Sequence, residues 1–296
     1  MRIRNLRDVW ARIRSATITA LLGAFAAVVC GTTVTAAPAP ETLRVYVLDC
    51  GTIDAGDPKS FNLTKDDIHS DGSFVSPCYL IVHPKGILMW DVGQVPDSAI
   101  KDDGTEASRN GVLKAKRKLL PQLAALGVKP KDVTYLAMSH YHGDHTANAN
   151  AFAHSTWIVQ KAEYDVMFSG KSIPMSSPED YTELRTARRI TLNNEDHDVF
   201  GDGRVVIKIA PGHTLGHQIL FLRLAHFGPL LLAGDLYHYP EEKTLDRVPS
   251  VDVDPALTRK TRRSVDAFLK ETGATMWIQH DPATYARLKK APAFYD

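Results

Sequence analysis

The sequence SHYHGDH at residues 139–145 is the most informative part of the chain. It follows an apolar run at 133–138 and places three histidines and one aspartate within six positions. His140 and His142 are two residues apart, so in an extended segment their side chains point to the same side. Imidazole and carboxylate groups suit Zn²⁺ and related transition metals. The segment therefore predicts a metal site directly after a buried strand.

A single turn cannot supply every ligand around a metal ion, so further ligands must come from other segments. The sequence offers His213, Asp235 and His280, each of which follows a short apolar run and stands beside a glycine, a proline or another polar residue. Such positions are typical of strand ends. We therefore expect these three residues to meet the 139–145 segment at one edge of a sheet.

Short runs rich in Val, Ile, Leu, Tyr and Trp predict many strands, with helices between some of them. One helix is expected around Pro121 and ends at Gly127, and a longer one is expected from an N-capping Thr258 to residue 270. Because no repeat and no clean linker is present, we predict a single α/β domain. The expected strands cover residues 43–48, 78–82, 87–90, 133–138, 157–159, 205–209, 219–224, 230–233 and 276–278.

The first 36 residues differ from the rest of the chain. Five arginines precede an uncharged apolar segment at 16–34, and Val34-Thr35-Ala36 reads as a small-residue cleavage site. This layout predicts a signal peptide over residues 1–36 and an exported protein, periplasmic or secreted. An uncleaved anchor helix is the alternative. No later apolar run approaches the length of a membrane span, so we expect no stable membrane insertion after cleavage.

Composition limits the partners of the mature protein. The whole chain has 296 residues, with 35 Lys and Arg against 34 Asp and Glu. Removal of residues 1–36 leaves 30 basic and 33 acidic residues, a net charge of −3. This balance excludes a nucleic-acid binder of the usual basic kind. The remaining cysteines, Cys50 and Cys78, could form a disulfide after export or stay as buried thiols, and the sequence leaves both open.

From about Leu43 to His280, the chain resembles the metallo-β-lactamase superfamily. The resemblance is carried by the motif at 140–145 and by the order of the three later ligands. It implies a four-layer αβ/βα sandwich as a single hydrolase domain, residues 37–296, with a dinuclear site at one edge. By motif position, the implied ligands are His140, His142 and His213 for one metal, Asp144, His145 and His280 for the second, and Asp235 as the bridge.

The resemblance also assigns two residues that support the ligands. Asp91, in the Asp-Val-Gly turn after the apolar run at 87–90, is expected to orient a ligand histidine by hydrogen bonding. His217 is expected to shape the loop that follows His213. The other histidines, apart from His238, lie outside any motif and are expected to pack without ligand roles.

The implied cofactor is a pair of divalent metal ions, with zinc preferred and cobalt, iron or manganese as alternatives. Two such ions can share and deprotonate one water, and the bridging hydroxide can attack a carbonyl carbon or a phosphorus. The sequence contains no Gly-x-Ser-x-Gly elbow of the kind that serine hydrolases need. We therefore predict metal-assisted hydrolysis.

Within the superfamily, the chain is most similar to the N-acyl-homoserine lactonase group. A bridging aspartate at the position of Asp235 is the pattern of lactonases, thioesterases and phosphodiesterases. The similarity implies opening of the lactone ring of N-acyl-homoserine lactones, which quenches quorum signals, and a small lactone with an acyl tail as substrate. The similar segments are residues 46–51, 77–81, 84–86, 90–93, 212–218 and 280–281.

Lactonases of this group often place a tyrosine three residues after the bridging aspartate, against the lactone carbonyl. That position is His238 here, flanked by Tyr237 and Tyr239, so we predict a substrate contact from among these residues. Asp144 is expected to carry the proton to the leaving alkoxide. An acyl tail requires an apolar groove. Candidates for it lie in or directly beside two long polar excursions, residues 51–74 and 169–186, and in the turn after Asp235: Phe61, Phe74, Met167, Phe168, Ile173 and Tyr239.

Three alternative functions remain at this stage. One is an exported metallo-β-lactamase, and another is a different lactonase, aryl esterase or organophosphate hydrolase on the same site. The third is an iron-binding redox protein, which is disfavoured because no flavin domain is present and His142 stands where an acidic residue would be expected. Related lactonases are often dimers, so a homodimer is a further expectation. The native metal and the preferred acyl-chain length are left open.

Overall fold

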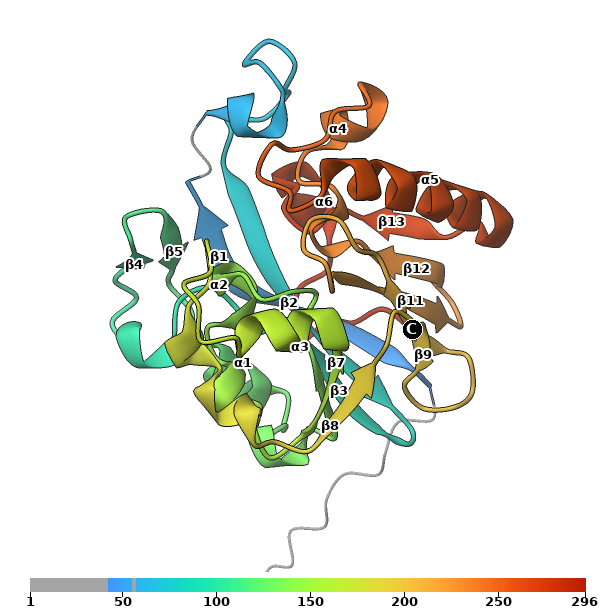
Figure 1. The fold of residues 1–296 in the computed structure, drawn as a ribbon. Coiled ribbons are helices and arrows are strands. Elements are labelled where there is room, and N and C mark those ends of the chain that lie inside the picture. Colours follow the sequence, from blue (N-terminus) through green and yellow to red (C-terminus); the bar gives the residue numbers. More distant parts are fainter. Residues whose placement is uncertain (1–41, 55–56) are drawn as a thin grey trace, which may run out of the picture. The chain divides into compact units, whose positions relative to one another are not determined.

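The computed structural model describes residues 42–54 and 57–296, which form two β-sheets with helices on their outer faces (Figure 1). In these residues the first sheet has eight strands in the order β4-β5-β1-β2-β3-β6-β7-β8. Strands β1, β2 and β3 pair antiparallel, whereas β3, β6, β7 and β8 pair parallel. The strands are β1 Arg44–Ile53, β2 Phe74–His83, β3 Gly86–Trp90, β4 Ala107–Arg109, β5 Leu113–Ala115, β6 Tyr135–Ala137, β7 Thr156–Gln160 and β8 Arg189–Leu192.

The second sheet has five strands within the described ranges, in the order β13-β12-β11-β10-β9. Its strands pair antiparallel except for β12 and β13, which pair parallel. They are β9 His197–Asp198, β10 Val205–Ile209, β11 Gln218–Leu224, β12 Gly228–Leu232 and β13 Thr275–Trp277. The α-helices are α1 Leu119–Ala125, α2 Gly143–Thr146, α3 Lys161–Met167, α4 Pro240–Thr244, α5 Pro255–Thr272 and α6 Pro282–Arg287.

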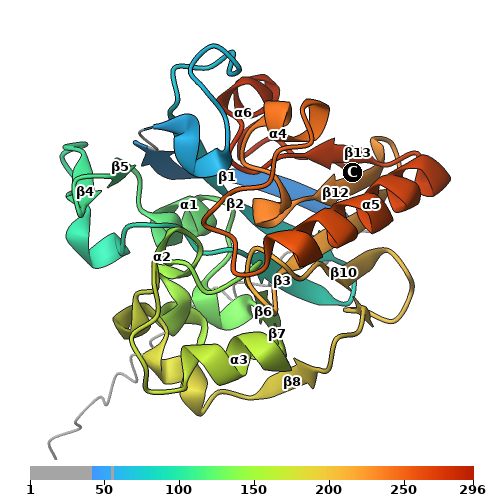
Figure 2. The same cartoon turned by 45° about the horizontal axis from the view of Figure 1, so that its top comes forward.

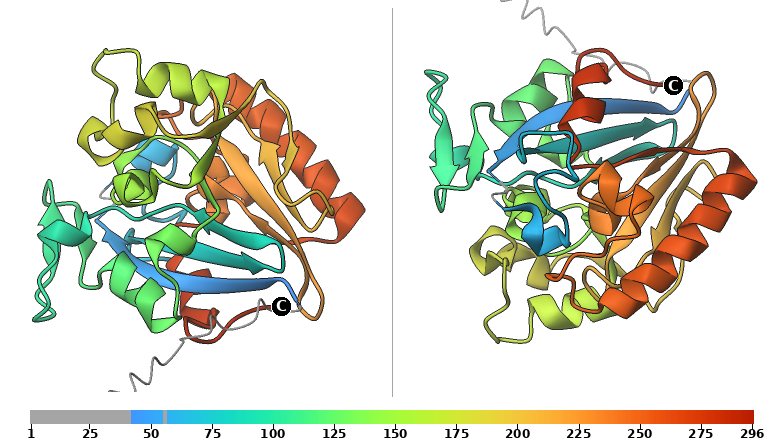
Figure 3. Two further views of the ribbon diagram at one scale, coloured as in Figure 1. Left: turned by 90° about the horizontal axis from the view of Figure 1, so that it is seen from below. Right: turned by 90° about the horizontal axis from the view of Figure 1, so that it is seen from above.

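Successive side chains along the strands point to opposite faces of each sheet, and both faces are buried. In β2, Tyr79 and Ile81 enter the core between the sheets, while Leu80 faces the layer that contains α1 and α3. In β11, Leu220 faces the core between the sheets and Phe221 faces α5. The sheets therefore lie face to face between two helical layers, with α5 outermost beyond the second sheet (Figure 3). The predicted four-layer α/β sandwich is confirmed.

Two helices differ from the expectation. The long helix α5 begins at Pro255, and its N-cap is Asp254, whose side chain accepts from the backbone N–H of Leu257. Thr258 is therefore not the cap; it is buried one turn inside the helix. Helix α3 was not predicted, because its sequence KAEYDVM has only a short apolar stripe. Figure 2 shows α5 along the second sheet and α3 on the other side of the fold.

Cys50 of β1 and Cys78 of β2 are joined by a disulfide, which settles the question that the sequence left open. Both residues are buried in the core layer beneath α1. The bond links neighbouring antiparallel strands and closes a loop with a sequence separation of 28 residues.

The start of β1 is covered by a segment from the C-terminal part of the chain. Val45 and Tyr295 exchange both backbone hydrogen bonds, at 2.8 and 3.0 Å, and the N–H of Ala291 donates to the carbonyl of Val47 at 2.9 Å. On this side, β5 pairs only with Thr52 and Ile53. Residues 291–295 thus complete the pairing of the first strand.

The proposed signal peptide, residues 1–36, lies outside the described residues. Within the described ranges, no helix has the length and apolar character that a membrane crossing requires.

Candidate metal centre

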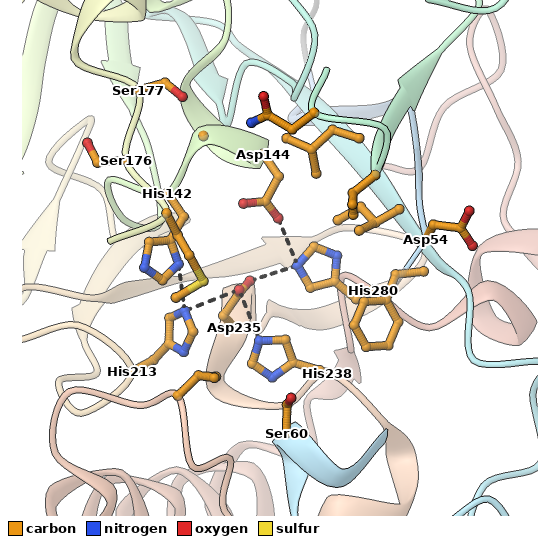
Figure 4. A pocket seen from close by; sticks show the side chains of 18 of the residues that line it. Asp54, Ser60, His142, Asp144, Ser176, Ser177, His213, Asp235, His238 and His280 are labelled. Carbon is orange, nitrogen blue, oxygen red and sulfur yellow. Dashed lines mark hydrogen bonds and ion pairs between the residues drawn. The ribbon is translucent and has the colours of Figure 1, made fainter. Parts of the chain in front are cut away.

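Loops at the ends of strands from both sheets bring the predicted ligands together. Figure 4 shows those that line the cavity: His142, Asp144, His213, Asp235 and His280. His140 and His142 follow β6, while Asp144 and His145 lie in the short helix α2. Asp235 and His280 come from the second sheet, after β12 and β13, and His213 comes from the loop between β10 and β11. The parallel pairing of β3 with β6 and of β12 with β13 directs these chain ends to one edge.

The first ligand group consists of His140, His142, His213 and Asp235, all buried. His140 Nε2 lies 2.8 Å from His142 Nδ1, and His213 Nε2 lies 3.2 and 3.1 Å from these two atoms. Asp235 Oδ2 lies 3.3 Å from His213 Nε2. Three imidazole nitrogens thus converge on one point beside a carboxylate.

The second group consists of Asp144, His145, Asp235 and His280. Here Asp235 uses its other oxygen: Oδ1 lies 3.2 Å from His145 Nε2 and 3.1 Å from His280 Nε2. Asp144 Oδ2 lies 3.2 Å from His145 Nε2. Because each oxygen of Asp235 faces one group, the carboxylate has the arrangement of a bridging ligand.

The donor atoms fit a pair of divalent cations. Asp235 Oδ1 and His145 Nε2 are buried without a hydrogen-bond partner among the described residues. Such orphaned polar atoms are costly unless another group satisfies them. The set of imidazole nitrogens and carboxylate oxygens is the one that zinc prefers. Within a single ligand group, the facing atoms lie within 4.8 Å of one another.

Asp91 orients His145 from the end of β3. Its Oδ2 lies 3.0 Å from His145 Nδ1 and accepts from Gln279 Nε2 at 2.8 Å, while Oδ1 accepts from the N–H of Ser139 at 2.6 Å. Asp91 adopts a φ of 54°, a left-handed conformation that non-glycine residues rarely hold without supporting contacts. The turn therefore aims the carboxylate at the ligand, as expected for this residue.

His217 supports the bridging aspartate through the backbone. Its Nδ1 lies 2.9 Å from the carbonyl of Ala210, and its Nε2 accepts from the N–H of Asp235 at 3.0 Å. This pattern requires the neutral ring with the proton on Nδ1. Burial and the neighbouring His213 lower the pKa of His217 to about 4, which keeps the ring neutral.

Two carboxylates that the sequence analysis missed also hold the site. Asp252 Oδ1 lies 2.8 Å from His213 Nδ1, and its Oδ2 accepts from the hydroxyl of Thr258 at 2.7 Å. Burial opposes ionisation, but the contact with His213 outweighs it and lowers the pKa of Asp252. The available signal was an aspartate-rich segment, VDVD, directly before the helix that starts at Pro255.

Glu163 of α3 is the second of these carboxylates. It accepts from the N–H of Tyr141 at 2.7 Å, the hydroxyl of Thr214 at 2.8 Å and the N–H of Gly216 at 3.0 Å. One buried side chain thus ties the loop of His140 to the loop of His213. Burial raises the pKa of Glu163 to about 7 despite these three donors. No sequence signal marks it, because it lies in a helix that was not predicted.

A cavity of about 540 Å³ opens over the ligands. It exposes polar and apolar side chains from several loops, and Figure 4 shows Ser176 and Ser177 on one side and Ser60 on another. Its lining comprises Ile53, Asp54, Ser60, Phe61, Phe74, Asn110, Val112, Leu113, His142, Gly143, Asp144, Met175, Ser176, Ser177, His213, Asp235, His238, Val251 and His280.

His238 lines this cavity, whereas the flanking tyrosines do not. Its Nε2 lies 3.2 Å from Asp235 Oδ2, and its Nδ1 lies 3.5 Å from Glu242 Oε1. Burial opposes protonation, but Asp235 and Glu242 outweigh it and raise the pKa of His238 to about 10. The structure does not bring Tyr237 to the cavity: alternation in this extended segment turns its ring to the opposite side, where it is buried and stacks on the guanidinium of Arg262. Tyr239 packs behind Phe61.

Only two of the six predicted groove residues line the cavity. Phe61 and Phe74 do line the cavity, but Met167, Phe168 and Ile173 pack in the outer helical layer. Phe168, for example, contacts Trp157 and Tyr181. The excursion that contains Ile173 instead sends its next residues, 175–177, into the cavity. The hairpin of β4 and β5 supplies Asn110 and Val112, which were not predicted because this hairpin has no strong strand signal.

Comparison with known proteins places the chain among characterised families. Residues 71–280 match the family model of the metallo-beta-lactamase superfamily. An N-acyl homoserine lactonase AttM of Rhizobium johnstonii is 32% identical over 266 residues, covering 86% of this chain and 98% of the relative. The AttM lactonase of Azorhizobium caulinodans is 29% identical over 263 residues, covering 86% of this chain and 99% of the relative.

Solved structures share the fold. A quorum-quenching N-acyl homoserine lactone lactonase superposes with a TM-score of 0.71 at 24% identity, covering 86% of this chain and 98% of the other. AidC, a dizinc quorum-quenching lactonase in complex with a product, superposes with a TM-score of 0.60 at 19% identity, covering 86% and 94%. At these identities the likeness shows the fold.

Proposed function

Because the chain belongs to the metallo-beta-lactamase superfamily and is a hydrolase similar to N-acyl homoserine lactonases, we propose that it opens the lactone ring of N-acyl-homoserine lactones. The observation that carries the proposal is Asp235, whose two oxygens face two ligand groups at the floor of a cavity. When two divalent ions are bound there, they supply an activated water as nucleophile and polarise the carbonyl oxygen of the substrate.

Two residues of the chain supply the remaining roles, a hydrogen bond to the substrate carbonyl and a proton for the leaving group. His238 Nε2 faces the cavity floor beside Asp235, so a protonated His238 can donate to the substrate carbonyl. The side chain of Asp144 is 16% exposed, against 4% or less for Asp235 and the ligand histidines His145 and His280. The carboxylate of Asp144 is thus the ligand group best placed to hold a proton for the leaving alkoxide.

The charge of the cavity supports a substrate with an uncharged ring and tail. None of the described lining residues is lysine or arginine. A β-lactam carries a carboxylate next to its ring, and beyond the proposed metal pair and His238 no described lining residue offers that carboxylate a cationic partner. This favours a lactone over the metallo-β-lactamase alternative.

The test is product analysis with the purified protein loaded with zinc. Incubation with a set of N-acyl-homoserine lactones is expected to give the ring-opened N-acyl homoserines, and a chelator is expected to abolish the turnover. Parallel assays use nitrocefin, an aryl ester and a phosphotriester. Faster turnover of any of these than of every lactone would overturn the assignment.

We also propose that the enzyme is exported. The basic and then apolar residues 1–36 support this, and the disulfide between Cys50 and Cys78 suits an oxidising compartment. N-terminal sequencing of the protein from a cell fractionation is expected to find a mature form that starts at residue 37 outside the cytoplasm. An intact N-terminus in the cytoplasmic fraction would contradict it.

A further inference from the structure

The mouth of the cavity is formed by two segments that are far apart in sequence. One is the hairpin of β4 and β5, which contributes Asn110, Val112 and Leu113 to the lining. The other is the segment 169–186, which contributes Met175, Ser176 and Ser177. Figure 1 shows the hairpin projecting from the edge of the first sheet.

The hairpin has few contacts with the sheet. β5 pairs with β1 through two residue pairs, Thr52 with Lys114 and Ile53 with Leu113, and β4 pairs only with β5 among the described strands. A two-stranded hairpin with so little support is marginally stable by itself. Further contacts also hold it over the site: Gln94 Nε2 donates to the carbonyl of Lys114 at 2.6 Å, and Ala115 packs with Val95 and Ile100.

An ion pair supplies such a contact between the hairpin and the segment 169–186. Arg109, the last residue of β4, donates to both carboxylate oxygens of Asp180, at 2.5 and 3.3 Å, and to Glu179 at 2.7 Å. The side chains of Arg109 and Asp180 are 15% and 3% exposed. A bidentate, largely buried pair fixes orientation as well as distance, unlike an exposed pair.

The other segment is held against the site by its own contacts. The N–H of Gly143 donates to the carbonyl of Met175 at 2.8 Å, and the hydroxyls of Ser176 and Tyr181 lie 2.6 Å apart. A Cβ at Gly143 would lie 2.8 Å from the hydroxyl oxygen of Ser177, so the absence of a side chain there allows this approach. Arg109 therefore joins β4, which pairs only with β5 among the described strands, to a segment that is seated against the site.

Apolar side chains that are exposed to solvent gather at this mouth. Of the seven large apolar side chains that are most exposed in the described residues, three line the cavity: Val112, Met175 and Val251, at 41%, 52% and 39% exposure. Exposed apolar groups around a cavity indicate a surface that a ligand covers. Val112 and Met175 belong to the two segments that Arg109 joins.

We propose that Arg109 is a specificity-determining positioning residue, which fixes the hairpin against the segment 169–186 so that Val112 and Met175 bind the distal part of the acyl tail. Arg109 does not itself line the cavity. This inference rests on the proposed lactonase function, and it concerns the tail rather than the ring. We call the ion pair of Arg109 with Asp180 and Glu179 the clamp. Loss of the clamp weakens binding of long tails and leaves ring opening intact.

The test compares Arg109→Gln and Asp180→Asn with a control on the same hairpin, Lys116→Gln. Lys116 pairs with Glu106 at 3.7 Å within the hairpin, and both side chains are exposed. KM and kcat are measured with butanoyl and decanoyl homoserine lactones. Both clamp variants are expected to raise KM for the decanoyl substrate about tenfold, the worth of roughly two buried methylene groups, with kcat and the butanoyl KM little changed.

A second pair of variants keeps the test independent of folding. Val112→Ala and Met175→Ala truncate exposed side chains, and they are expected to reproduce the loss for the decanoyl substrate alone. Affinity for the decanoyl homoserine product, measured by calorimetry, is expected to fall in parallel. Equal losses on both tails, or no loss in the clamp variants, would overturn this inference alone. Failure of the unaltered enzyme to open any acyl-homoserine lactone would overturn the proposed function and this inference with it.

Discussion

Loss of the bond between Cys50 and Cys78 is expected to destabilise the domain by an amount that follows from its position in the chain. The cysteines are separated by 28 residues. In the chain-entropy account, a closed loop of this length removes about 12 cal/mol/K of entropy from the unfolded chain, or about 3.5 kcal/mol at 25 °C. Because native domains are stable by only about 5–15 kcal/mol, this is a large fraction of the total.

The assay is urea unfolding of metal-free protein, followed by circular dichroism, with and without a phosphine reductant. With an m-value of about 3 kcal/mol/M, the reduced protein is expected to unfold at a urea concentration lower by about 1.2 M. The double variant Cys50→Ala, Cys78→Ala serves as control, because its midpoint should not respond to reductant. The chain has 3 cysteines, and the third, Cys30, lies in the proposed signal peptide.

Two results would refute this reasoning. One is equal midpoints for the oxidised and reduced wild-type protein, which would mean that the bond does not constrain the unfolded chain. The other is a thiol titration in denaturant, without reductant, that finds two reactive thiols, because the bond would then be absent from the purified protein.

Three further predictions concern the site. Asp252→Ala removes the partner of His213 Nδ1 and is expected to lower zinc affinity about 10- to 100-fold, measured by competition with a chromophoric chelator; unchanged affinity would show that Asp252 does not orient the ligand. The pKa of Glu163, about 7 in the fold against an ordinary 4.5, means that the folded state binds more protons between these values, so the unfolding free energy falls as pH rises from about 4.5 to 7. In metal-free wild-type protein, the unfolding free energy is expected to fall by roughly 3 kcal/mol over this range. Glu163→Gln should show no such fall, and identical pH profiles for the two proteins would exclude the raised pKa of Glu163. Gly216→Ala would place a Cβ 2.5 Å from the backbone nitrogen of Glu163, so a loss of about 1–3 kcal/mol in unfolding free energy is expected, and a neutral result would show that the α3 contact yields easily.

Local patterns predicted the strands and the candidate ligands, whereas the four-layer arrangement and the division of the ligands into two groups followed from the family resemblance. Short apolar runs ended near the observed strand ends, and each ligand stood directly after such a run, as His280 does after β13. The supporting carboxylates were different. Asp252 and Glu163 reach the site only through the packing of α3 and of the loop before α5, and a side chain that acts across such a distance leaves no spacing in the sequence.

The cavity wall shows a second reason for failure. Phe168 lies at the end of α3 and Met175 in the excursion that follows, and only the crossing of that excursion over Gly143 decides which residues face the ligands. Tyr237 was misplaced for a simpler reason. In an extended segment, neighbouring side chains point to opposite sides. The substrate contact could therefore come from His238 or from the flanking tyrosines, but not from both.

The pairing of residues 291–295 with β1 has a consequence for biosynthesis. A strand whose N–H and C=O groups lack a partner is a template for other chains. Among the residues that the structure describes, the first half of β1 has no neighbour on this side until the end of the domain has been made. A nascent chain thus passes through a stage in which its earliest strand is open to intermolecular association. Chains truncated after Lys290 are therefore expected to be lost to aggregates instead of accumulating as inactive monomers.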